Sequence, residues 1–264
     1  MTTYNGANNG DRMRVNAIVC WYDEPLSQLE DCIRGLTTVA DKVVAIDGRY
    51  QRYAGDSASS PPEQADLIRD VARDVGLDCD IYIPTEPFAG QVAKRSFSLQ
   101  EGVPGSDFFM VADCDHIWSG PRDVIRRELE RTPANVDGLT VKMFTPANRS
   151  RPMEVSAAGK WHADHADKWL SPQRIFRSLP DVRVERFHWW YSAEKNGKRI
   201  WLWGGDRTRP HATMREMAAP MVVEHRCLFR EPLQIERNRE FCEDRIAIVA
   251  ETGQEDDVQV EAVA

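Results

Sequence analysis

The chain has 264 residues, of which 42% are hydrophobic and 29% are charged, and its formal net charge is −8 at pH 7. This length is enough for one large domain with a sizeable core, and the acidic balance argues against indiscriminate binding of the whole surface to nucleic acid or anionic membrane. No apolar run approaches the roughly 18 residues that cross a bilayer, so no membrane span is expected.

Strands and helices alternate through the first 120 residues. Short apolar runs predict strands over residues 15–21, 42–46, 80–83 and 108–113. Apolar residues at helical spacing predict helices between them, over 26–36, 61–75 and 92–101. Ser60 is expected to cap the second helix, with Pro61 and Pro62 in its first turn. Such alternation is typical of a parallel α/β sheet.

Two carboxylates spaced i, i+2, Asp113 and Asp115, end the apolar run that begins at Phe108. Carboxylates are costly to bury, and a divalent cation shared with substrate phosphates is the usual compensation. In an open α/β sheet, ligands bind outside the carboxyl ends of the strands, where these two residues are predicted to lie. The pattern favours a metal–diphosphate site, although the same residues could simply form a turn or cap the next element.

Acidic residues also follow the first two predicted strands, with Asp23 and Glu24 after one and Asp47 after the other. These strand ends share an edge of the sheet, as a nucleotide crevice requires. Neither G-x-G-x-x-G nor a P-loop motif occurs, so phosphates must be bound by the metal and by nearby cations. Lys94 and Arg95 are the candidates, because they begin a predicted helix; an ordinary solvated helix face is the alternative.

The second half differs in composition. Residues 142–209 contain 14 Lys/Arg and 7 Asp/Glu, a local balance of +7, and six of the eight tryptophans. Cations interleaved with aromatic rings suit a nucleic acid, a sugar or a phosphorylated acceptor. Asn196-Gly197 predicts the tight turn of a hairpin, in which Trp189, Trp201 and Trp203 could instead be core residues.

Beyond the hairpin, residues 221–225 read as one more strand that ends in His225. The arginine-rich segment that follows is expected to be helical, and the acidic tail 251–264 to be flexible. The stretch 162–167 contains His-x-x-His with nearby carboxylates, and we interpret it as an acceptor-side loop rather than a zinc site. The six cysteines show no metal-ligand spacing, and the start of the chain lacks a signal-peptide core, so a cytoplasmic location is expected.

Three segments, Ala17–Pro25, Val43–Gly48 and Val111–Asp115, together resemble GT-A fold glycosyltransferases, which use a nucleotide-sugar donor and a divalent metal. The resemblance covers about residues 14–120 and is closest to small, phage-encoded members, which would place the protein in host cytoplasm. It implies an α/β, Rossmann-type, mostly parallel sheet flanked by helices, with a mixed C-terminal portion. It also implies one catalytic domain over 14–250, divided into a nucleotide-sugar half (14–120) and an acceptor half (121–250), after a flexible stretch 1–13.

By this resemblance Asp115 would coordinate Mn²⁺ or Mg²⁺, and Asp113 would contact the ribose or the donor sugar, directly or through the metal. Many members add a late histidine as a metal ligand, which matches His225, with His188 as second choice. The bound metal would stabilise a departing nucleoside diphosphate as a Lewis acid, helped by Lys94 or Arg95.

The same resemblance assigns the donor and acceptor sides, with a UDP-sugar as the expected donor and a hydroxylated DNA base, a protein or a glycan as acceptor. The residues expected around the nucleotide sugar are Trp21, Tyr22, Asp23, Asp47, Lys94, Arg95 and Asp113. Those expected on the acceptor side are His188, Trp189, Trp190 and Glu194. Glu185, Glu194 and Asp206 are all possible general bases, and the stereochemistry stays open. A nucleotidyltransferase acting on a sugar phosphate and a non-catalytic binding module are the alternative functions.

Overall fold

The computed structural model describes residues 12–146, 168–185, 188–206 and 208–226. The predicted His-x-x-His loop and the predicted acidic tail therefore lie outside the described residues, as does almost all of the predicted flexible start. Of the predicted arginine-rich helix, Arg226 alone is described, and it is not in a helix.

A nine-stranded mixed sheet is the centre of the described fold, with the order β3-β2-β1-β4-β7-β6-β12-β5 and β11 beside β6. The four strands at one end are mutually parallel: β1 (Val15–Cys20), β2 (Lys42–Ile46), β3 (Asp78–Tyr82) and β4 (Phe108–Asp113). The others are β5 (His116–Ser119), β6 (Gly138–Thr145), β7 (Lys168–Arg177), β11 (Met214–Glu216) and β12 (Val222–His225). Strand β7 runs antiparallel to both β4 and β6, and so joins strands from both halves of the chain in one sheet.

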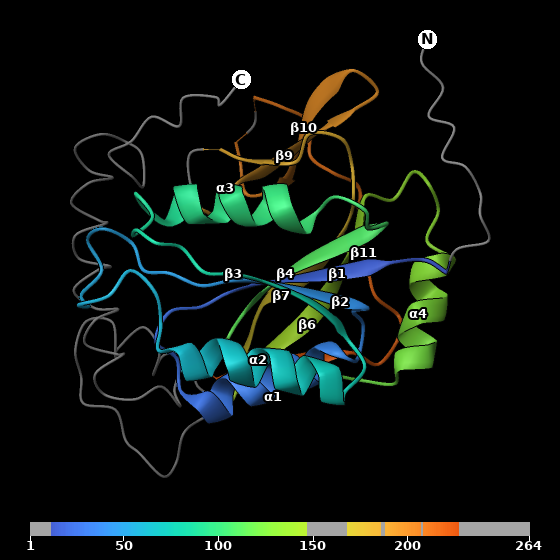
Figure 1. The fold of residues 1–264 in the computed structure, drawn as a ribbon. Coiled ribbons are helices and arrows are strands. Elements are labelled where there is room, and N and C mark those ends of the chain that lie inside the picture. The colour runs from blue at the N-terminus through green and yellow to red at the C-terminus, as the bar shows by residue number, and fades with distance from the viewer. Residues whose placement is uncertain (1–11, 147–167, 186–187, 207, 227–264) are drawn as a thin grey trace.

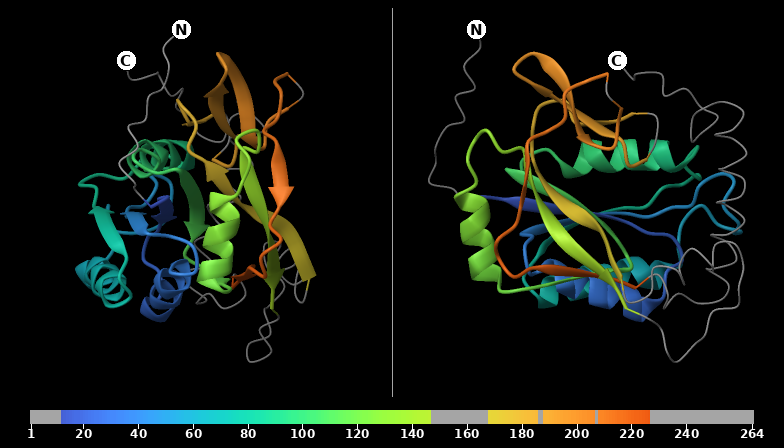
Figure 2. Two further views of the ribbon diagram at one scale, coloured as in Figure 1. Left: turned by 90° about the vertical axis from the view of Figure 1, so that its right-hand side faces the viewer. Right: turned by 180° about the vertical axis from the view of Figure 1, so that it is seen from behind.

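Helices cover both faces of the parallel strands (Figure 1). Helices α1 (Leu26–Leu36) and α2 (Pro62–Asp74) pack on one face, and α3 (Gln91–Gly102) lies on the other. A small antiparallel sheet of β8 (Arg183–Val184), β9 (Tyr191–Lys195) and β10 (Lys198–Trp203) lies on the α3 side (Figure 2). None of the helices described here has both the length and the apolar character needed to cross a membrane.

Alternating side chains of the central strands fill two separate cores. On β1, Val15, Ala17 and Val19 belong to the core beneath α1 and α2, whereas Ile18 belongs to the core on the α3 side. Successive strand residues point to opposite faces, so a strand covered on both faces reads as a continuous apolar run. This explains why the strands of the parallel half of the sheet could be predicted from their apolar runs.

The predicted alternation of strands and helices over the first 113 residues is confirmed, and so is the hairpin. Its turn residues Asn196 and Gly197 have φ values of 54° and 71°, as a tight hairpin turn requires. The predicted cap on α2 is wrong: no side chain caps this helix, and the Ser60 hydroxyl instead donates to Asp47 Oδ1 at 2.6 Å. The strands β5, β6 and β7 and the helix α4 (Arg122–Glu130) were not predicted.

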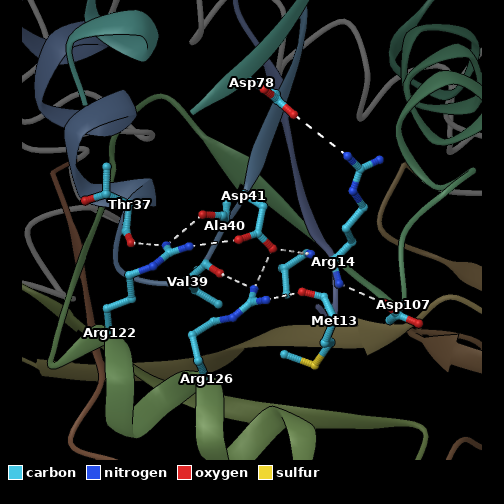
Figure 3. Close-up of polar contacts among 11 residues, drawn as sticks. Met13, Arg14, Thr37, Val39, Ala40, Asp41, Asp78, Asp107, Arg122 and Arg126 are labelled. Carbon is cyan, nitrogen blue, oxygen red and sulfur yellow. Dashed lines mark hydrogen bonds and ion pairs between the residues drawn. The ribbon is translucent and has the colours of Figure 1, made fainter. Parts of the chain in front are cut away.

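An ion network attaches α4 to the amino ends of β1 and β2 (Figure 3). The Asp41 carboxylate accepts hydrogen bonds from Arg122 Nη2 at 2.8 Å, from Arg126 Nη1 at 2.7 Å and from the backbone N–H of Val15 at 2.9 Å. Arg126 also donates to the carbonyl oxygens of Val39 and Met13. The network lies at the edge of the sheet opposite to the carboxyl ends of the parallel strands, so we assign it to stability.

Candidate functional site

The strand order reverses between β1 and β4. The chain moves outward from β1 to β2 and β3 and then returns to place β4 on the other side of β1. Their last residues, Cys20 and Asp113, are direct register partners. A crevice that binds ligands is expected at such a switch point, outside the carboxyl ends of the strands. The loops that carry the predicted nucleotide and metal residues begin here.

Asp115, His116 and His225 form a compact group that could hold a metal ion. One ligand atom from each lies within 4.8 Å of the others. The two oxygens of the Asp115 carboxylate lie 3.9 Å from His116 Nε2 and 3.4 Å from His225 Nε2, and Asp115 is only 1% exposed. The histidines meet because β5 and β12 are antiparallel and His116 and His225 are register partners.

The second nitrogen of each imidazole is also engaged. His116 Nδ1 accepts the Asp113 backbone N–H at 3.3 Å, which leaves the proton of the neutral ring on Nε2, facing Asp115. His225 Nδ1 lies 3.4 Å from the buried Thr145 hydroxyl, which can accept its proton and leave the Nε2 lone pair for an ion. His225 is therefore the better metal ligand of the two.

The donor set discriminates between metals. One carboxylate with imidazole nitrogens suits borderline divalent ions such as Mn²⁺, Fe²⁺ or Zn²⁺. Mg²⁺ prefers oxygen ligands and gives up its waters reluctantly. Of the two ions expected from sequence, Mn²⁺ fits Asp115 and His225 better.

Asp113 and Arg95 form an ion pair at the mouth of the crevice, with Nη2 of Arg95 3.2 Å from Oδ1 of Asp113. About half of the Asp113 side chain is exposed, at 52%, whereas that of Arg95 is nine-tenths buried. Burial would raise the pKa of Asp113, but the nearby guanidinium of Arg95 is the largest opposing influence, and the pKa is lowered overall. Nη1 of Arg95 is buried and has no hydrogen-bond partner within the part of the chain that the structure describes.

Lys94 occupies a different position from the one expected beside a diphosphate. Its buried Nζ donates to the carbonyl oxygens of Trp21 and Gly48, both at 2.6 Å, and lies 5.6 Å from the centre of the Tyr50 ring. Desolvation lowers the pKa of Lys94. We therefore interpret Lys94 as a structural residue that links the ends of β1 and β2. Arg95 is then the cation beside Asp113.

Asp47 is likewise buried, although it was expected to contact the nucleoside. Its carboxylate accepts hydrogen bonds from the Gly48 N–H at 2.6 Å and from the N–H and hydroxyl of Ser60 at 2.8 and 2.6 Å. Burial raises the pKa of Asp47, and the hydrogen bonds from Ser60 and Gly48 partly offset that rise. In this structure Asp47 shapes the loop after β2 instead of presenting its carboxylate to a ligand.

The first predicted nucleotide loop also contains both buried and accessible residues. Trp21 is buried, and its backbone N–H donates to the Ile46 carbonyl at 3.0 Å. Tyr22 is partly exposed; its hydroxyl donates to the Ser57 carbonyl at 3.0 Å, and its ring meets that of Tyr53 edge to face. Asp23 is also partly exposed, with a φ of 50°. Of the three residues of this loop that were expected to contact the nucleotide sugar, Tyr22 and Asp23 are thus the accessible ones.

The acceptor-side residues lie in the small sheet, three in the connection between β8 and β9 and Glu194 on β9. His188 interacts electrostatically with Asp113 and contributes to lowering the pKa of that carboxyl, so this histidine lies near the crevice. Trp189 is 40% exposed, and its ring meets that of Trp190, which in turn packs against Trp201. Glu194 is exposed on β9 opposite Arg199. Trp201 is a core residue, as the hairpin interpretation predicted, but Trp189 is not.

Contacts within the protein engage the other candidate bases and several cations of the basic stretch. Among the described residues, the Glu185 carboxylate accepts hydrogen bonds from Ser192 and Arg209, and that of Asp206 accepts from Thr208. Several of the counted cations form ion pairs within the protein, namely Lys142, Arg183, Lys195, Arg199 and Arg209. Of these five, Lys142 and Lys195 pair with acids outside residues 142–209, namely Glu216 and Asp137, so the pairs offset two of the seven excess positive charges.

The sequence predicted Asp115 and His225 of the metal group and Asp113 at the mouth of the crevice, and the structure brings these three residues together. It adds His116, which was missed although it directly follows the acid pair. No protein-family model matches the chain, and no curated protein matches it at a significant level. The function is therefore argued from the geometry of the site.

Proposed function

We propose that this chain is a metal-dependent glycosyltransferase that moves a sugar from a nucleoside-diphosphate sugar, expected to be a UDP-sugar, to a hydroxyl acceptor. One observation carries the proposal: Asp115 and His225, 110 positions apart in the printed sequence, meet beside the Asp113–Arg95 pair at the switch point of the sheet. A carboxylate–imidazole group suits a metal–diphosphate ligand when it lies next to an arginine whose Nη1 has no hydrogen-bond partner among the described residues.

In this proposal Asp115 and His225 hold the metal, which we expect to be Mn²⁺, and His116 faces the Asp115 carboxylate. When bound, the ion would supply Lewis-acid stabilisation of the departing diphosphate. Arg95 donates to phosphate oxygens, and its paired Asp113 orients the guanidinium and presents a carboxylate to the ribose or donor sugar. Lys94 and Asp47 act indirectly, by holding the strand ends and the loop that surround the nucleoside.

Acceptor binding is assigned to the side of the crevice near His188. The exposed Trp189 ring, which meets Trp190 edge to face, offers a flat apolar face of the kind on which a sugar or a base can stack. Glu194 is exposed on the same small sheet, so it stays a candidate base for an acceptor hydroxyl. The acceptor remains a hydroxylated DNA base, a protein or a glycan.

The test is release of nucleoside diphosphate from a panel of nucleotide sugars, with Mn²⁺, with Mg²⁺ and with chelator. It compares wild type, Asp115→Ala and the control Asp70→Ala, which changes an exposed carboxylate paired with Arg73 on α2. We expect release with one donor, faster with Mn²⁺ than with Mg²⁺, lost in Asp115→Ala and retained in Asp70→Ala.

Two results would contradict the proposal. One is the absence of both release and donor-induced thermal stabilisation, which would favour a binding module. The other is pyrophosphate release from a nucleoside triphosphate and a sugar phosphate, which would indicate a nucleotidyltransferase.

A further inference from the structure

Arg226 directly follows His225 and joins three separate parts of the protein. Its backbone N–H donates to the carbonyl oxygen of Asp115 at 2.7 Å. Its side chain donates from Nη1 to Oδ2 of Asp31 on α1 at 2.5 Å, and from Nε to Glu224 on β12. One residue therefore connects the end of β12, the loop after β4 and helix α1.

The position of these contacts matters because β12 has four residues and ends at His225. Its pairing with β6 extends only to Glu224, and its pairing with β5 ends at His225 itself. The Arg226 N–H to Asp115 bond adds one more link beyond the ladder, and it does so at a proposed metal ligand. Without such a link, His225 would be the terminal residue of a short strand, where pairing is weakest.

The side chain of Arg226 fixes the orientation of the end of β12, which the backbone bond alone cannot do. Successive strand residues point to opposite sides, so Glu224 and Arg226 share one side of the strand end while His225 faces the other. The planar guanidinium bridges Glu224 and Asp31 with two different nitrogens, which a lysine ammonium cannot reproduce. The bridge therefore limits rotation of the strand end about its own axis.

Helix α1 is a suitable reference for this bridge because it also contacts the acid loop. Besides Asp31, it carries Cys32, whose buried thiol lies 3.7 Å from the carbonyl oxygen of Asp113 and donates to it. The helix thus meets the strand that carries the acids and, through Arg226, the strand that carries the late histidine.

We infer that Arg226 is a positioning residue that holds His225 in register with Asp115 for metal binding, through its bridge to Asp31. This inference rests on the proposed metal site. The bridge is partly exposed, with 32% of the Arg226 side chain and 49% of that of Asp31 accessible. Exposed ion pairs contribute little to global stability, so loss of the bridge should change metal affinity rather than the free energy of unfolding.

The experiment measures Mn²⁺ binding to the full chain by the electron paramagnetic resonance signal of the free ion, together with the Tm of the metal-free protein. The variants are Arg226→Gln, Arg226→Lys and Asp31→Asn, all of which keep the backbone bond to Asp115. The control, Arg34→Gln, removes other exposed ion pairs of α1, those with Glu30 and with Asp74.

We expect Arg226→Gln and Asp31→Asn each to weaken Mn²⁺ binding by about tenfold, the usual range for a group that orients a metal ligand. The double variant should be no weaker than either single one, because both remove the same contact. Arg226→Lys should recover only part of the affinity, and Arg34→Gln should bind as wild type. The metal-free Tm should stay within about 3 °C of the wild-type value.

Wild-type affinity in Arg226→Gln and Asp31→Asn would overturn the inference and leave the proposed metal site intact. An affinity loss that parallels a fall in metal-free Tm would also overturn it, because Arg226 would then be merely structural. Failure of the wild-type protein to bind Mn²⁺ would overturn both this inference and the proposed function.

Discussion

Replacing Arg126 with methionine should destabilise the protein strongly, because this guanidinium is almost completely buried in the network beneath α4 (Figure 3). The substitution removes the donor to Asp41 Oδ2 at 2.7 Å and to the Val39 carbonyl at 3.0 Å, together with the donor to Met13. Methionine keeps the packing of the apolar stem of arginine but replaces none of these bonds.

The expected cost can be worked from the partners that remain. Breaking a buried ion pair by removing one member costs about 3–5 kcal/mol. Asp41 keeps Arg122 Nη2 at 2.8 Å and the Val15 N–H at 2.9 Å, so its carboxylate is not left uncompensated. We therefore expect the lower end, about 3 kcal/mol, which corresponds to a fall in Tm of about 6–12 °C for a domain of this size.

Urea unfolding at neutral pH, followed by circular dichroism, measures this free energy. The control is Arg127→Met, the same substitution at the neighbouring, exposed position of α4, which should cost less than about 1 kcal/mol. If Arg126→Met costs no more than Arg127→Met, the network does not attach α4 in the way described, and the assignment of stability to this edge of the sheet fails.

Three further predictions concern the site and its surroundings. Since hydrogen bonds from Ser60 lower the raised pKa of Asp47, Ser60→Ala should move that pKa further above its unfolded value. The free energy of unfolding should then fall more steeply than in wild type as the pH rises from about 4 to about 7 in urea titrations, and parallel curves would contradict this. His225→Gln should weaken Mn²⁺ binding at least about tenfold with little change in metal-free Tm, measured by calorimetry; unchanged binding would exclude this ligand. Gly204→Ala should cost about 1–3 kcal/mol more than Gly197→Ala: both residues have positive φ, but only at Gly204 would a Cβ meet tryptophan rings, the nearest atom at 2.3 Å, and equal costs in urea would refute this.

Local pattern was enough to predict the elements of the parallel half and the acid pair at its edge. Strands β1 and β4 are buried on both faces, so their apolar runs are nearly unbroken, and polar residues mark where each ends. Helices α1 and α2 show apolar residues at helical spacing because one face of each packs on the sheet. By contrast, β6 alternates in burial along its length and pairs with β7, about 30 positions further along the chain, so its local signal was weaker.

The sequence by itself determined which residue types lie at the strand ends, because the carboxyl end of a strand can be located from its own apolar run. It therefore supplied Asp113, Asp115 and His225 as candidates. Only the tertiary structure decided which of the polar residues are accessible, since their hydrogen-bond partners are remote in sequence. Lys94 donates to the carbonyl oxygen of Trp21, 73 positions away in the chain, and is therefore buried. The register of β5 against β12 brings His116 next to His225, although more than a hundred residues separate them in the sequence.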